Sequence, residues 1–216
     1  MSLQHGDTFF PSGGIAFSWG LETLHADGLL CSATEVQQFL HGQLKHRWST
    51  CDRIALVRVH QCAGDLDRVA ACDTELEVLA LARELREGSR RAGATLLRVH
   101  SQLGTPQADI YREKVRDGFA YGHVAAVPGL LWRGVGMSCD EAQVTSAHTL
   151  CLGLLGAAIR LGVIGHIDGQ KILQAAHGII NDLMAVDVAD ELSSFVPASE
   201  IAMMRHEVGQ SRLFAN

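Results

Sequence analysis

Residues 138–160 read SCDEAQVTSAHTLCLGLLGAAIR, and this stretch decides the fold class. Ser138 and Glu141 have the spacing of a capping box, in which the serine oxygen accepts from a first-turn amide and the glutamate reaches back to the cap. An apolar run follows, and each glycine inside a helix costs roughly 0.5 to 1 kcal/mol relative to alanine. Gly153 and Gly156 therefore indicate that neighbouring helices approach closely. The stretch predicts the central, buried helix of a helical bundle.

The same stretch has about the length of a membrane span, because residues 142–159 carry no formal charge. Its first half, however, holds polar side chains that are costly to desolvate in hydrocarbon. These side chains are Gln143, Thr145, Ser146, His148 and Thr149. A buried helix of a soluble bundle is the favoured interpretation, and no membrane partner is expected.

Helix signals recur along the rest of the chain. Residues 54–60 alternate in a way that also fits a strand, although a helix is favoured there. Residues 66–97 contain no proline and are rich in good helix formers. Helix starts are expected at Ser32, Thr50 to Asp52, Thr105-Pro106, Ser138, Asp168 and Ser199. The fold class is therefore all-α, a single-domain bundle of about eight or more helices that spans residues 1–216.

A charged group lies in the middle of the chain, at Arg83, Glu84, Arg86, Glu87, Arg90 and Arg91. Two interpretations are open for it. The group could dock a partner, or it could be a solvated helix face stabilised by pairs three or four residues apart, each contributing about 0.2 to 0.5 kcal/mol. The solvated face is favoured.

The composition is typical of a folded protein that does not bind nucleic acid. Of the 216 residues, 47% are hydrophobic and 19% are charged, which excludes disorder throughout. The formal net charge is −6, and phosphate contacts would need clustered Lys and Arg that the chain as a whole does not supply. Nucleic acid is therefore not an expected partner.

The first residues and the cysteines favour the cytoplasm. Residues 1–7 lack the basic start and the apolar run of a secretory signal. The six cysteines contain no C-x-x-C pair, and scattered cysteines in a reducing compartment are mostly small buried apolar groups. We expect no disulfides.

A search for catalytic and cofactor motifs is mostly negative. The chain has no G-x-x-x-x-G-K-[ST] loop, no G-x-S-x-G elbow, no H-E-x-x-H and no zinc-like cysteine spacing. Glu22 could be a buried catalytic acid, but no base or nucleophile lies near it in sequence, so a structural or interface carboxylate is favoured. Among the histidines, His5 and His206 are weak candidates for metal ligands. No tightly bound cofactor is expected.

The last residues of the chain are unusual. Residues 200–216 end on a cation beside two large apolar side chains, Arg212, Leu213 and Phe214, with no chain left to bury them. The tail could pack on its own core, or it could fold onto another protein on binding. At the other end, residues 1–14 form a turn-rich N-terminal segment, in which Gly13-Gly14 permits unusual backbone angles.

Two motifs at opposite ends of the chain resemble the UreF family of urease accessory proteins. The first runs from Phe10-Pro11-Ser12-Gly13-Gly14 through Phe17-Ser18-Trp19-Gly20-Leu21-Glu22, and the second from Arg205-His206-Glu207 through Gln210-Ser211-Arg212-Leu213-Phe214. The two motifs occur in the same order as in the family, and the chain has roughly the length of a family member. Val208-Gly209 departs from a more polar pair in the family.

The resemblance implies an all-α protein that is usually dimeric and is not an enzyme. It also implies partners, which are the UreD/UreH accessory protein, the GTPase UreG and apo-urease, in a complex that delivers nickel with GTP dependence. In this reading nickel is cargo in transit. The partner-binding residues carried over are Pro11, Gly13, Gly14, Ser18, Gly20, Leu21, Glu22, Arg205, His206, Glu207, Gln210, Ser211, Arg212, Leu213 and Phe214, with residues 200–216 as the docking tail.

Two other functions stay open at this point. A stand-alone nickel-binding metallochaperone would use His5 or His206 to bind the metal stoichiometrically. A small all-α enzyme would use Glu22, Arg160 or the histidines in a deep polar pocket, and its turnover would survive deletion of the tail.

Overall fold

The computed structural model describes residues 2–7, 9–11, 17–62, 64–207 and 214. In these ranges the regular structure is helical throughout, and no strand occurs in them. The elements in chain order are α1 (Ser2–His5), α2 (Leu21–Ala26), α3 (Ala33–Gln43), η2 (Leu44–Asp52), α4 (Arg53–Gln61), α5 (Leu66–Leu79), α6 (Arg83–Gln102), α7 (Ala108–Arg116), α8 (Val127–Gly134), α9 (Cys139–Arg160), α10 (His166–Met184) and α11 (Pro197–His206). The all-α prediction is confirmed.

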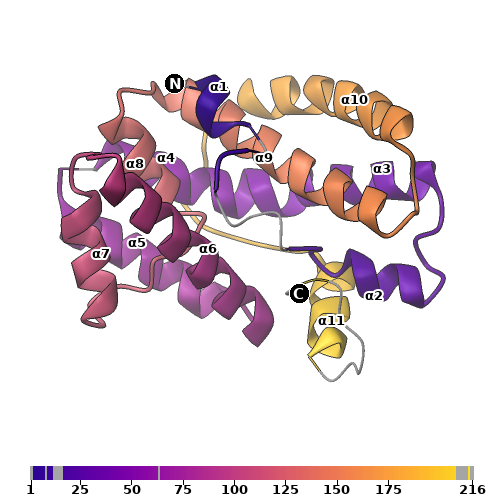
Figure 1. Cartoon of the computed structure of the whole chain (residues 1–216), viewed down its shortest axis with the longest axis horizontal. Helices are drawn as coiled ribbons and strands as arrows, with labels where there is room; N and C mark the ends of the chain where they lie inside the picture. Colours follow the sequence, from indigo (N-terminus) through magenta and orange to yellow (C-terminus); the bar gives the residue numbers. More distant parts are fainter. Residues whose placement is uncertain (1, 8, 12–16, 63, 208–213, 215–216) are drawn as a thin grey trace.

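Helix α9 is the central helix that the sequence predicts. Its capping box is present, because Ser138 Oγ accepts from Glu141 N–H and the Glu141 carboxylate accepts from Ser138 N–H. By length and composition α9 could cross a membrane, but its apolar residues form the core. Ala142 packs in one buried cluster, with α4 to α8, whereas Cys151 and Leu154 pack in a second, with α2, α3 and α10. Figure 1 shows α9 running between these two groups of helices.

The helical segments from α3 to α4 form one continuous helix beside α9. The backbone angles of Leu44 and Asp52 at its internal boundaries are right-handed helical, so α3, η2 and α4 join without a break. The expected helix start at Thr50 to Asp52 is therefore wrong, whereas the helix favoured over residues 54–60 is confirmed. At the beginning of α3, Ser32 Oγ caps Glu35 N–H as predicted.

Three other expected helix starts are wrong by a few residues. α7 begins at Ala108 and not at Pro106. The Thr105 hydroxyl does not cap this helix, because it is hydrogen-bonded to Nδ1 of the buried His100 at 2.8 Å. Asp168 lies inside the first turn of α10, whose N-cap is Gly165. Ser199 lies inside α11, which begins at Pro197, a residue suited to a first turn that needs no N–H partner.

The N-terminal segment is partly helical. Residues 2–5 form the short helix α1, and Phe10 N–H then closes a turn onto the Asp7 carbonyl. All six cysteines are free thiols, and Cys51, Cys72 and Cys151 are buried.

Candidate functional site

The two terminal motifs meet at one place in the fold. Residues 18–22 lead into α2, and this segment packs against α11 and the beginning of α6. Figure 1 shows α2 beside α11. We call this contact of α2, α11 and the first turn of α6 the junction. Sequence positions about 180 residues apart are thereby brought together, as the hydrogen bond from Ser199 Oγ to the Trp19 carbonyl, 2.6 Å long, illustrates.

Gly20 makes the close approach at the junction possible. Its φ of 82° is left-handed, and a Cβ there would lie 2.8 Å from the Ser199 carbonyl oxygen and 2.9 Å from Ala202 Cβ. Trp19 beside it also has a positive φ, of 56°, which is rare for a bulky side chain. Only glycine fits position 20, because any side chain would both strain the backbone and push α11 away.

His206 lies between two carboxylates at the centre of the junction. Its Nδ1 is 2.8 Å from Glu84 Oε2, and its Nε2 is 3.3 Å from Glu22 Oε2. His206 and Glu84 are buried. Ionised carboxylates only accept hydrogen bonds, so both contacts are hydrogen bonds when each ring nitrogen carries a proton. In that state the imidazolium ties α11 to both α2 and α6.

Glu207 caps the beginning of α6. The N-cap residue Ala82 supplies no side-chain acceptor, and Glu207 Oε1 instead accepts from Glu84 N–H at 3.1 Å. The carboxylate also lies 3.5 Å from Arg83 Nε. A negative charge at a helix N-terminus is favourable, since first-turn amides there lack intrahelical partners.

The outer side of the junction carries a two-point ion pair. Both terminal nitrogens of Arg205 bind the carboxylate of Asp27, which follows α2, with Nη2 at 3.1 Å from Oδ1. The Arg205 side chain is 58% exposed. The pair is a geometrically specific link between the end of α2 and α11 on the solvent side.

The end of the tail packs on its own chain. Phe214 is only 8% exposed, its N–H donates to Glu22 Oε2 at 3.1 Å, and the Arg160 guanidinium lies 4.7 Å from its ring centroid. Of the two predictions for the tail, the structure therefore shows packing on the chain's own core for Phe214. Binding of a partner by the tail stays a prediction.

The remaining predicted partner-binding residues fall into two groups. Ser18 and Leu21 are fully buried and support the junction from inside, whereas Pro11 is exposed and lies outside it. The others lie outside the described residues, and they are Gly13, Gly14, Gln210, Ser211, Arg212 and Leu213.

Sequence reasoning missed Glu84. The charged group from Arg83 to Arg91 was expected to form a solvated face, but Glu84 is buried against His206. The signal that could have found it is helical spacing, because Glu84 lies four residues before Gly88 and eight before Ala92, on the small-residue face of α6. The exposed members of the group, Arg83, Glu87 and Arg91, do lie on the solvent side.

The two histidines proposed as weak metal candidates lie in different surroundings. The ring nitrogens of His206 each face a separate carboxylate. His5 is buried and stacks on His100 with ring centroids 5.0 Å apart. Burial lowers the pKa of His5, and the positive chain terminus lowers it further. In the described part of the chain, no three His, Cys, Asp or Glu side chains converge as a metal site would require.

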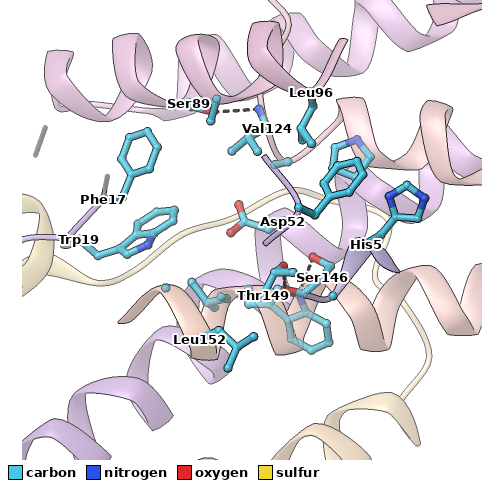
Figure 2. Close-up of a pocket in the computed structure, with 18 of the residues that line it drawn as sticks. His5, Phe17, Trp19, Asp52, Ser89, Leu96, Val124, Ser146, Thr149 and Leu152 are labelled. Atoms are coloured by element: carbon cyan, nitrogen blue, oxygen red, sulfur yellow. Dashed lines mark hydrogen bonds between the residues drawn. The ribbon is translucent and has the colours of Figure 1, made fainter. Parts of the chain in front are cut away.

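A cavity of about 290 Å³ lies directly behind the junction. Trp19 belongs to both, since its carbonyl accepts from Ser199 at the junction and the residue also lines the cavity. Arg160, which lies against Phe214, is a second lining residue. Figure 2 shows Phe17 and Trp19 on one side of the cavity and His5 on the other. The ring of Phe17 seats on α6 at Gly88, where a Cβ would come within 2.1 Å of it.

The helical segment η2 places an ion pair in the cavity wall. It is a nine-residue π-helix, in which hydrogen bonds join residues five apart, as from Arg53 N–H to the Trp48 carbonyl. Arg47 and Asp52 are also five apart, so the wider turn brings them to one side, with Arg47 Nη2 3.3 Å from Asp52 Oδ1. Burial raises the pKa of Asp52, although Arg47 opposes the shift.

Comparison with known proteins agrees with the resemblance of the two terminal motifs to the UreF family. The family model described as UreF matches residues 30–177. Relatives named urease accessory protein UreF include one from Trichodesmium erythraeum, which is 33% identical over 99% of this chain and 95% of its own, and one from Lachnoclostridium phytofermentans, which is 28% identical over 98% and 96%. A third, from Haemophilus influenzae, is 26% identical over 96% and 91%. The chain belongs to the UreF family of urease accessory proteins, which assist urease and are not themselves enzymes.

Proposed function

We propose that this protein is a scaffold of the complex that matures the urease metallocentre. In this role it binds the UreD/UreH accessory protein and the GTPase UreG, and it presents them to apo-urease in the cytoplasm. Nickel passes through the complex as cargo, and GTP hydrolysis belongs to UreG, since this sequence contains no P-loop motif. We further propose that the scaffold works as a homodimer.

The junction is the observation that carries this proposal. It joins the two motifs by which the sequence resembles the family, and it fixes the course of α11 immediately before the tail. A tail whose first residues are held in place loses less entropy on binding a partner than a free one.

The outer face of α11 supplies suitable contacts for a partner. Ile201 is 57% exposed and Met204 is 40% exposed, and Arg205 lies beside them. Apolar side chains next to an arginine are typical of the small clusters that dominate interface energies.

The test is size-exclusion chromatography with light scattering of the purified protein mixed with the UreD/UreH and UreG homologues from the same source. A chain that ends at Glu207 is the informative truncation. A chain that ends at Ala202 would also lose the buried Met203 and His206 and would damage the junction itself.

We expect the intact chain to form a complex with both partners and the chain ending at Glu207 to stay folded but lose recruitment of the GTPase. Circular dichroism of the truncated chain is the control for folding. If neither form associates with the partners under any nucleotide or nickel condition, the scaffold function is wrong.

A further inference from the structure

The cavity behind the junction has the properties of a small-molecule site. Its volume of about 290 Å³ is near the lower end of the range for ligand pockets, which are mostly apolar with a few placed polar groups. Aromatic rings from four separate segments form much of its wall, and they are Phe10, Phe17, Trp19, Trp48 and Trp132. Flat apolar walls of this kind select a compact ligand with a planar body.

A carboxylate is presented to the interior. Asp52 uses Oδ1 to bind Arg47, and no hydrogen bond to its Oδ2 occurs among the described residues. Figure 2 shows the Asp52 carboxylate directed into the space between Trp19 and His5. The Arg47 guanidinium is turned instead against the Trp19 ring, 5.1 Å from its centroid. The cavity therefore offers a hydrogen-bond acceptor to its contents.

Several hydroxyls of the wall have their hydrogen bonds within the protein, whereas His5 Nδ1, Arg47 Nε and Trp132 Nε1 have no partner among the described residues. Ser146 Oγ accepts from the Trp48 ring nitrogen at 3.2 Å, and the Thr149 hydroxyl donates to the Ser146 carbonyl. Ser89 Oγ accepts from Val124 N–H. Asp52 Oδ2 is therefore a carboxylate acceptor that the wall offers to a ligand.

We propose that this cavity binds a small molecule with a planar apolar body and a hydrogen-bond-donating head, such as a primary amine, with the head on Asp52. The inference goes beyond the scaffold function and does not depend on it. A carboxylate ligand is disfavoured at the same position because it would face the Asp52 oxygen with a like charge.

The intrinsic fluorescence of the protein reports binding directly. All three tryptophans of the chain line the cavity, so a ligand inside it changes the surroundings of the indoles that emit. We choose 2-phenylethylamine as the probe and compare it with 2-phenylethanol and phenylacetate, which keep the ring and change only the head. Titration calorimetry gives the affinities.

We expect the amine and the alcohol to quench tryptophan emission and phenylacetate to bind about tenfold more weakly than the amine, because one hydrogen bond to a charged group is worth about that factor. Asp52→Asn removes the negative charge and should reduce the difference in affinity between 2-phenylethylamine and phenylacetate. Absence of binding by all three compounds at millimolar concentration to the folded full chain would overturn the proposal.

A matched pair of glycine substitutions locates the site. Gly156 lines the cavity in α9, and a Cβ there meets nothing within 4 Å, so the close helix approach expected at this glycine is wrong. Gly156→Phe therefore fills the space without a backbone clash. Gly178 in α10 is also unobstructed but is exposed and lies outside the cavity, so Gly178→Phe is the control. We expect Gly156→Phe to abolish binding and Gly178→Phe to keep it. Equal affinities in the two variants would show that the ligand binds elsewhere.

Discussion

At the scale of single residues, Gly20 determines how closely the two ends of the protein approach. We predict that Gly20→Ala destabilises the fold by about 3 kcal/mol, from the left-handed φ and from overlap with Ser199 and Ala202. Gly28 has a φ of 74° and open space around it, so Gly28→Ala carries the backbone cost alone, about 1 kcal/mol. Urea denaturation of both variants measures the difference, and equal losses would mean that the contact with α11 contributes nothing.

Phe214 tests whether the tail is part of the core. Phe214→Ala should cost about 3 kcal/mol of unfolding free energy, because the ring is buried under Arg160. Phe195 is 76% exposed, and the matched Phe195→Ala should change stability by no more than about 0.5 kcal/mol. Chemical denaturation decides, and a Phe214→Ala variant as stable as Phe195→Ala would show that the tail does not pack on its own chain.

His100 makes stability depend on pH. Burial and, to a lesser extent, the neighbouring His5 ring stacked on it lower its pKa from 6.5 to about 4. The folded state therefore favours neutral His100. The folded protein keeps its full stability above pH 6.5, and as the pH falls from 6.5 towards 4 the free energy of unfolding decreases by up to about 1.4 kcal/mol per pH unit, because the unfolded chain binds the proton more readily.

The measurement for His100 is the free energy of unfolding between pH 7 and pH 4. His100→Asn should flatten this dependence, whereas His166→Asn, at an exposed position, should leave it unchanged. An unchanged slope in His100→Asn would assign the acid sensitivity to other groups.

At the scale of elements, α6 depends on α11 for its N-terminal cap. Glu207→Ala should cost about 1 kcal/mol and speed hydrogen exchange in the first turn of α6, because Glu84 N–H loses its acceptor. Glu191 is an exposed glutamate outside the helices, and Glu191→Ala is the control. If hydrogen exchange in the first turn of α6 is as slow in Glu207→Ala as in the unaltered protein, Glu207 does not cap this helix.

The sequence predicts some elements well and others poorly, for physical reasons. The capping box at Ser138 and the apolar run after it are local signals, so α9 is predicted closely. The π-helix η2 has no proline or glycine that marks it, and it becomes apparent only when Arg47 and Asp52 are seen together in the cavity wall. Thr105 was misassigned as a cap because its hydroxyl binds the buried His100, a partner that spacing alone does not identify.

At the scale of the whole molecule, the termini of a long chain form one site. The two end motifs are visible in the sequence, but their meeting is not, because it depends on Gly20, on the buried Glu84 and on the path of α11. The cavity is likewise assembled from residues of many elements and has no sequence motif of its own.

The central claim is that the junction holds α11 and the tail in the arrangement that recruits partners. A charge exchange at Asp27 and Arg205 tests it most directly, because this pair lies on the exposed side of the junction and joins the end of α2 to α11. Complex formation with the UreD/UreH and UreG homologues is measured for Asp27→Arg, Arg205→Asp and the double variant. We predict that each single variant weakens the complex and that the double variant restores part of it, because the exchange re-forms the ion pair while the arginine contact to a partner stays lost. Binding that is unaffected in both single variants would contradict the account.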